Sequence, residues 1–136
     1  MIEDLERQGV IRRLPPDTKK VADAMALARR DIETARRLLP TDHDWAYNIA
    51  YNAILQAGRA LMFAKGYRPD GTNQHTAVVK FAELFLDKGD IFIFDRMRRK
   101  RHSSVYDTAG AISGAEAEFA VRAAEALMQK IETLLG

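Results

Sequence analysis

The chain has 136 residues, of which 47% are hydrophobic and 29% are charged, a balance typical of a folded globule and not of a disordered chain. It contains no cysteine, which excludes a disulfide framework and a thiolate metal site. Its formal net charge is only +2, so the molecule as a whole is not a polycation.

Residues 1–14 are interpreted as an N-terminal extension. Within them, residues 2–8 are expected to form one or two helical turns, which Gly9 and the pair Pro15-Pro16 bring to an end. No stretch of the chain approaches the roughly 20 apolar residues of a membrane-spanning helix. The N-terminus opens with acidic residues and has no apolar core of a secretory signal, so we expect a cytoplasmic protein that does not enter the membrane.

A first long helix is predicted from Asp17 to about residue 39. Asp17 is a favoured residue at a helix start, and Pro40 stops the helix. Apolar or small residues recur in it at alternating spacings of four and three, which keeps one helix face turned toward a partner. They are Val21, Met25, Ala28, Ile32, Ala35 and Leu39.

The second helix, from about 41 to 65, is predicted to be the centre of the bundle. Asp42 lies at its start, and Gly66 provides the stop. Alanines recur along it at the same spacing, which allows close approach of neighbouring helices. They are Ala46, Ala50, Ala53, Ala57, Ala60 and Ala64. Three aromatic residues of this helix are interpreted as core or interface residues and not as platforms for stacked bases: Trp45, Tyr47 and Tyr51.

A polar loop is predicted over residues 67–74, and a shorter helix from about His75 to Asp87. Lys88-Gly89 is read as the break that ends this helix. The position of His75 at the helix start allows contact with a phosphate or with the arginine-rich helix that follows. A capping or packing role is, however, the commoner one for such a histidine.

The segment 91–94, Ile-Phe-Ile-Phe, fits either a buried strand or a helix. Because no second strand candidate is evident, we interpret it as the first turn of a helix that Asp90 caps and that ends near Asp107. A small-residue loop then leads to a last helix at 115–135. The prediction is an all-α, up-and-down bundle of four to five helices at 17–135, within a single domain that spans residues 1–136.

Residues 96–102 read Arg-Met-Arg-Arg-Lys-Arg-His and hold five fixed positive charges in seven positions. In a regular helix, Arg98 and Arg101 interrupt an otherwise apolar stripe, whose other members are Ile91, Phe94 and Val105. One interpretation is a solvated cluster that complements the helix dipole. The other is a site for an acidic or phosphate partner. The chain has no zinc pattern, glycine-rich phosphate loop or nucleophile elbow, and the last helix is too acidic for a DNA-binding helix-turn-helix.

These residue types suit RNA cleavage. Guanidinium groups bind phosphate through two hydrogen bonds and stabilise charge in a phosphoryl transition state. A histidine can accept the proton of a ribose 2′-hydroxyl. Because neighbouring positive charges disfavour the imidazolium form, they would keep His102 available as a base.

Several segments, in their order and spacing, resemble the HEPN domain, a small α-helical family of prokaryotic toxin–antitoxin and defence systems. They are the long helix Trp45-Ala-Tyr-Asn through Met62, the loop Lys65-Gly-Tyr-Arg-Pro, His75 at the next helix start, the segment Phe94-Asp-Arg-Met-Arg-Arg-Lys-Arg-His-Ser-Ser-Val-Tyr-Asp, and the closing Ala115-Glu-Ala-Glu. The resemblance covers roughly residues 15–135. It implies a homodimer that brings two copies of the arginine motif together, and metal-independent endoribonuclease activity in active members. It also implies a partner or antitoxin of the minimal nucleotidyltransferase class, and no cofactor or metal.

The family motif is an arginine, a polar residue and a histidine four to six residues beyond the arginine, and this chain fits it in two incomplete registers. If Arg101 is the motif arginine, His102 takes the polar position and Tyr106 stands where the histidine is expected. If His102 is the motif histidine, Arg96 lies at an allowed separation, but Met97 takes the polar position. The first register fits the helix end better, although tyrosine is a poor general base near pH 7.

The sequence thus predicts a HEPN-like toxin–antitoxin component that binds RNA or nucleotide phosphate, with metal-independent endoribonuclease activity as the reaction that the resemblance implies. The alternative is a non-catalytic helical module that partners a minimal nucleotidyltransferase. The candidate phosphate- or RNA-binding residues are Arg96, Arg98 and Arg101. The candidate catalytic residues are Arg101, His102 and Tyr106.

Overall fold

The computed structural model describes the backbone of residues 1–106 and 109–136 and the side chains of residues 1–101 and 109–136. Over these residues the chain forms helices and one pair of short strands, so the prediction of an all-α bundle is confirmed apart from the strands. In chain order the elements are α1 (Ile2–Arg7), β1 (Ile11–Arg13), α2 (Thr18–Leu38), α3 (His43–Ala64), β2 (Tyr67–Pro69), α4 (Gln74–Ala82), α5 (Lys88–Tyr106) and α6 (Gly114–Leu135).

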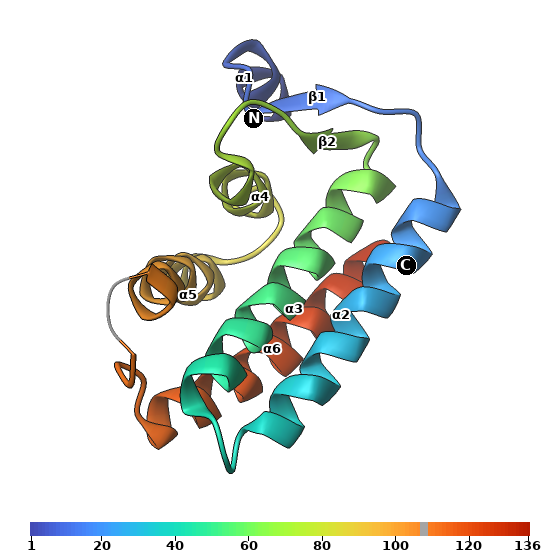
Figure 1. Ribbon diagram of the computed structural model, residues 1–136. Helices are drawn as coiled ribbons and strands as arrows, with labels where there is room; N and C mark the ends of the chain where they lie inside the picture. Colours follow the sequence, from blue (N-terminus) through green and yellow to red (C-terminus); the bar gives the residue numbers. More distant parts are fainter. Residues whose placement is uncertain (107–108) are drawn as a thin grey trace.

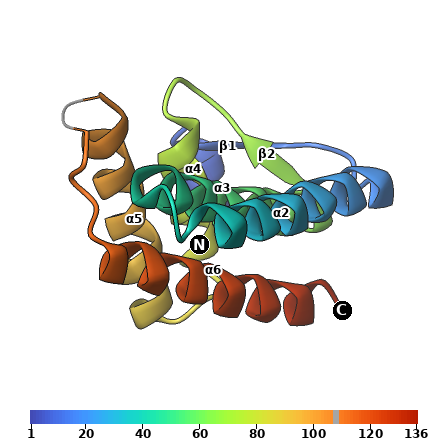
Figure 2. The ribbon, with the colours of Figure 1, turned by 60° about the horizontal axis from the view of Figure 1, so that its bottom comes forward.

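The helices form two groups that meet on α3. Helices α2, α3 and α6 lie side by side, whereas α4 and α5 are steeply inclined to them on the other side of α3 (Figures 1 and 2). Helix α3 contacts α2, α4, α5 and α6 and is therefore the centre of the fold, as the sequence predicts. Five alanines of its stripe are fully buried, and only Ala64, at the helix end, is exposed.

Helix α4 approaches α3 closely at Gly58. A Cβ atom added to this glycine would lie 2.5 Å from a methyl group of Val78 in α4 and 3.8 Å from the ring of Phe94 in α5. Real Cβ atoms do not come this close to another carbon, so the site has no room for a side chain. Both inclined helices, α4 and α5, therefore pack against α3 at Gly58.

The pairing of β1 with β2 departs from the prediction of a polar loop over residues 67–74. The two strands are antiparallel, with Ile11 opposite Pro69 and Arg13 opposite Tyr67. Each strand has only three residues, too few to show a period of two in the sequence. Their pairing covers Ile11, which is almost completely buried, and ties the N-terminal extension to the end of α3.

The boundary between α4 and α5 also differs from the prediction. Helix α4 ends at Ala82 and not at Asp87, and α5 begins at Lys88. The Asp87 side chain accepts a hydrogen bond of 2.9 Å from the backbone N–H of Asp90, and this hydrogen bond holds the pKa of the Asp87 carboxyl below its usual value. Because Asp87 caps the helix, Lys88-Gly89 forms its first turn instead of a break. The interpretation of 91–94 as helix is confirmed.

The first turn of α3 fixes the entry to α6. Asp42 caps α3, as predicted, through a 3.1 Å hydrogen bond from the N–H of Trp45. Asp44 instead accepts hydrogen bonds from the N–H groups of Gly110 (2.6 Å) and Ile112 (3.2 Å) in the loop before α6. Trp45, interpreted as a core or interface residue, is 53% exposed, so it does not belong to the core and its interface role stays a prediction. Tyr47 and Tyr51 are buried, as predicted.

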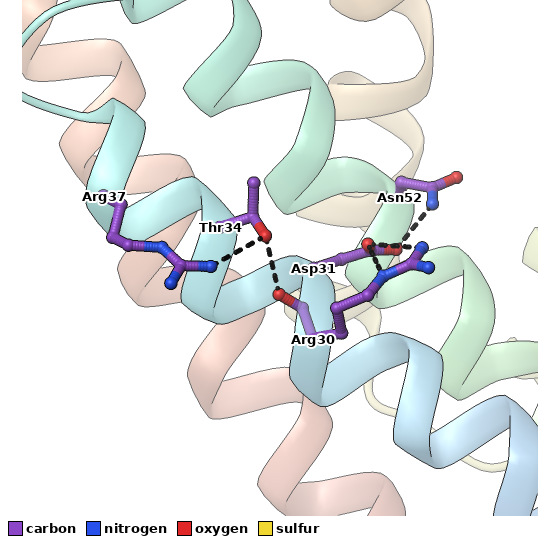
Figure 3. Close-up of polar contacts among 5 residues, drawn as sticks. All are labelled: Arg30, Asp31, Thr34, Arg37 and Asn52. Atoms are coloured by element: carbon purple, nitrogen blue, oxygen red, sulfur yellow. Dashed lines mark hydrogen bonds and ion pairs between the residues drawn. The ribbon is translucent and has the colours of Figure 1, made fainter.

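One carboxylate lies buried between α2 and α3 (Figure 3). Asp31 accepts hydrogen bonds from the guanidinium of Arg30, at 2.9 and 3.0 Å, and from the side-chain amide of Asn52, at 2.7 Å. Thr34 lies next to this cluster and donates to the backbone carbonyl of Arg30. The buried charge is thus partnered on both of its oxygens, as a buried carboxylate requires.

Among the described residues, no helix combines the length and the apolarity that are needed to cross a membrane.

Candidate nucleic-acid interface

Helix α5 presents Arg98 toward α4 and holds it in place with an acid one turn earlier. The Arg98 guanidinium donates to Asp95 through Nε at 3.0 Å and Nη2 at 2.9 Å. Arg99 lies within 3.4 Å of the other oxygen of the same carboxylate. One carboxylate therefore orients two arginines, which leaves a surplus of positive charge on this helix face.

Arg101 lies one turn further along α5 and rests on a buried aromatic ring of α3. Its guanidinium carbon is 5.8 Å from the centroid of the Tyr51 ring, within the range of a cation–π contact. Among the described residues, no carboxylate lies within ion-pair distance of Arg101. The charge of Arg101 is thus positioned but not neutralised by that part of the chain.

His75 of α4 joins these residues through the same tyrosine. Its Nδ1 atom is 2.9 Å from the hydroxyl oxygen of Tyr51, whose side chain is completely buried. Burial lowers the pKa of His75 below its usual value, and the positive charges of Arg101, Arg98 and Arg59 lower it further. Burial and these charges therefore favour the neutral form of the His75 imidazole.

Arg59 of α3 completes a cluster drawn from three helices. It is the only charged residue between Asp44 and Lys65, and its guanidinium carbon lies 5.7 Å from the ring centroid of Phe63. Its Nε atom is buried and has no hydrogen-bond partner among the described residues. We call Arg59, His75, Arg98 and Arg101 the basic face.

A groove of about 680 Å³ opens next to the basic face, between α4 and α5. Its volume is in the range of small-molecule and nucleotide sites. Four cations and two acids line it, so its charge is positive. The cations are Lys80, Lys88, Arg98 and Arg99, and the acids are Glu83 and Asp95.

Arg96, which the sequence groups with Arg98 and Arg101, lies apart from them. It lines a second, largely apolar groove of about 340 Å³, together with Tyr47, Met97 and the exposed rings of Phe92 and Phe119. Burial raises the pKa of Tyr47 to about 12, and the charge of Arg96 opposes this rise. Residues two positions apart in a helix differ by about 200° around its axis, which turns Arg96 away from Arg98.

The predicted residues His102 and Tyr106 belong to the helical backbone of α5, but their side chains lie outside the described residues. The sequence allows a contact of His75 with the arginine helix but does not identify His75, Arg59 or Tyr51 as parts of the site. The signal for Arg59 was its isolation as a lone charge in a long apolar helix. Among the described side chains, no group of three or more acids and histidines is placed to hold a metal ion.

A comparison with models of known protein families identifies the family of this chain. The sequence model described as "HEPN domain" matches residues 21–134. The chain belongs to the HEPN family. The resemblance seen in the sequence is thereby confirmed, and with it the association with a family known for ribonuclease activity in toxin–antitoxin and defence systems. A search of curated proteins finds no match to this HEPN chain.

The HEPN fold is also seen in a solved structure of similar shape. The crystal structure of TT1696 from Thermus thermophilus matches with a TM-score of 0.69 and 16% sequence identity. The match covers 84% of this chain and 97% of that one. At this level of identity the similarity establishes a common fold.

Proposed function

We propose that this HEPN domain acts in a toxin–antitoxin or related module and binds RNA or a nucleotide through phosphate groups on the basic face. The observation that carries the proposal is that Arg101 stacks on the buried ring of Tyr51, whose hydroxyl is hydrogen-bonded to His75, and that the charges of Arg101, Arg98 and Arg59 all act on this histidine. Only Arg98 of these arginines has a carboxylate partner among the described residues. A guanidinium without an acidic partner is a ready site for a phosphate, which it can bind through two hydrogen bonds.

The proposal predicts that the affinity for RNA depends on the charge of Arg101 and on the salt concentration. Arg101→Gln is expected to weaken binding of a mixed-sequence single-stranded RNA by about fivefold to tenfold. The slope of log K against log salt should also become smaller by about 1, because one fewer counterion is released. Fluorescence anisotropy at several salt concentrations measures both quantities.

The matched control is Arg122→Gln in α6. Arg122 is exposed and paired with Glu118, and it lies outside the basic face, so its replacement should change neither affinity nor slope. Equal losses in both variants would show that only the overall charge matters. An unchanged affinity in Arg101→Gln would contradict phosphate binding at the basic face.

The ribonuclease part of the proposal has its own test. Single-turnover cleavage of the same RNA, with EDTA present, is compared for the wild type, Arg101→Ala and His102→Ala. Cleavage that disappears in both variants is the result expected of a metal-independent HEPN ribonuclease with an incomplete motif. Folded wild-type protein that binds this RNA without cleaving it would exclude the enzyme for that substrate and leave a binding role.

The second groove supports a protein interface as well, which favours the alternative of an interaction module. Phe92 and Phe119 are more than half exposed there, and exposed aromatic rings at a rim with one arginine are typical of protein–protein contacts. We propose a second copy of this chain as the occupant, and a minimal nucleotidyltransferase as the further partner, because HEPN proteins commonly have both. Light scattering of the purified chain tests the homodimer directly.

A further inference from the structure

The hydrogen bond between Tyr51 and His75 restricts the tautomer of the histidine. The Tyr51 hydroxyl is buried, and among the described residues its hydrogen-bond partner is Nδ1 of His75, at 2.9 Å. A phenol carries one O–H donor, and a buried donor that is left without an acceptor loses its hydrogen bond to water with nothing in return. The hydroxyl therefore donates to Nδ1, which must accept with its lone pair.

The proton of the neutral imidazole then resides on Nε2. The histidine is only partly buried, so this N–H group remains available to a partner from outside. Besides burial, the positive charges of Arg101 and Arg98 on α5 and of Arg59 on α3 lower the pKa of this histidine, and Arg101 stacks on the same Tyr51 ring that holds it. Positive surroundings disfavour a second proton on the ring but favour an anionic acceptor beside it.

We propose that Tyr51 positions His75 in the Nε2–H tautomer, and that this N–H donates a hydrogen bond to a phosphate oxygen of the RNA held by Arg98 and Arg101. The inference rests on the proposed function and adds a neutral donor to a site of cations. It also sets the chemical role of His75. Because Tyr51 occupies the only lone pair of the ring, His75 binds phosphate and does not serve as a general base.

The salt dependence of RNA binding distinguishes a neutral hydrogen-bond donor from a cation. His75→Asn retains an acceptor near the position of Nδ1 for the Tyr51 hydroxyl but has no group at the position of Nε2. It is expected to weaken RNA binding by about tenfold or more, since tenfold is the lower end of the effect of losing a hydrogen bond to a charged group. The slope of log K against log salt should stay at the wild-type value, since a neutral donor releases no counterion.

His75→Gln is the matched variant, because its amide nitrogen can reach the position of Nε2 and donate. Its affinity is expected to remain within about threefold of the wild type, well inside the roughly tenfold loss expected of the asparagine. Thermal unfolding followed by circular dichroism, recorded for both variants, shows whether they are folded. A loss of affinity in both variants, or in neither, would overturn the donor role of Nε2.

The tautomer of His75 can be measured by ¹⁵N NMR in the absence of RNA. In the wild type, long-range ¹H–¹⁵N spectra above the pKa of His75 are expected to show protonated Nε2 and unprotonated Nδ1. In Tyr51→Phe the two tautomers should mix, with a smaller loss of RNA affinity than in His75→Asn. A protonated Nδ1 in the wild type would overturn the proposal even if RNA binds as expected. Wild-type protein that shows the Nε2–H tautomer and binds no RNA would instead refute both the proposed function and the phosphate contact.

Discussion

Gly58→Leu is expected to lower the free energy of unfolding by about 3 kcal/mol or more, which is the upper end of the usual cost of overpacking a core. The reason is the 2.5 Å approach of Val78 to the position of a Cβ atom at this residue. The stem of a valine cannot swing away as the end of a long side chain can, so α4 must move off α3. Urea unfolding followed by circular dichroism gives the change.

The same substitution should also disturb the basic face. Val78 is one turn beyond His75 on α4, and a displaced α4 would carry His75 away from Tyr51. Ala126→Leu, at an exposed position of α6, adds a large side chain without a clash and serves as the control, with an expected change within about 0.5 kcal/mol. Equal stabilities of the two variants would mean that α4 does not rest on Gly58.

Asp31→Leu is expected to destabilise the fold by about 2–3 kcal/mol, because it removes the acceptor of a charged hydrogen-bond cluster between α2 and α3. Asn52 would lose the partner of its amide. Arg30 would lose its carboxylate, but its side chain is 63% exposed and can be hydrated instead, which keeps the effect below that of a fully buried ion pair. The midpoint of urea unfolding measures this change.

The matched control for Asp31 is another acid of α2. Glu33→Leu removes an exposed carboxylate whose ion pair is with Arg36, and surface pairs of this kind contribute about 0–1 kcal/mol. A similar small effect at both positions would show that the Asp31 cluster is hydrated and adds no more stability than a surface pair.

The sequence alone was sufficient to predict the long helices and the family. Asp17, Asp42 and the stripes of small and apolar residues are local signals, and a helix is a local structure whose hydrogen bonds join residues four apart. The ends of α2, α3 and α6 therefore agree with the prediction to within one or two residues. The order of the motifs likewise identified a HEPN domain before any contact was known.

Local rules were less successful where an element is short or where one side chain sets its boundary. The strands β1 and β2 have three residues each and lie far apart in the sequence, so only the folded chain brings them together. The start of α5 depends on the Asp87 cap. Gly89 follows two residues later, and because glycine commonly breaks a helix, the local sequence indicated a break at this position. The position of Arg96, by contrast, follows from helix geometry alone, because residues two positions apart lie on nearly opposite sides of a helix.

Only the tertiary structure decided the composition of the basic face. Its four residues come from α3, α4 and α5, and Tyr51 and His75 are 24 positions apart in the chain. Such residues meet because α4 and α5 both settle on one surface of α3, where Gly58 and the buried ring of Phe94 allow close packing. Helix periodicity fixes which residues share a face of one helix, but the packing of side chains between helices determines which faces meet.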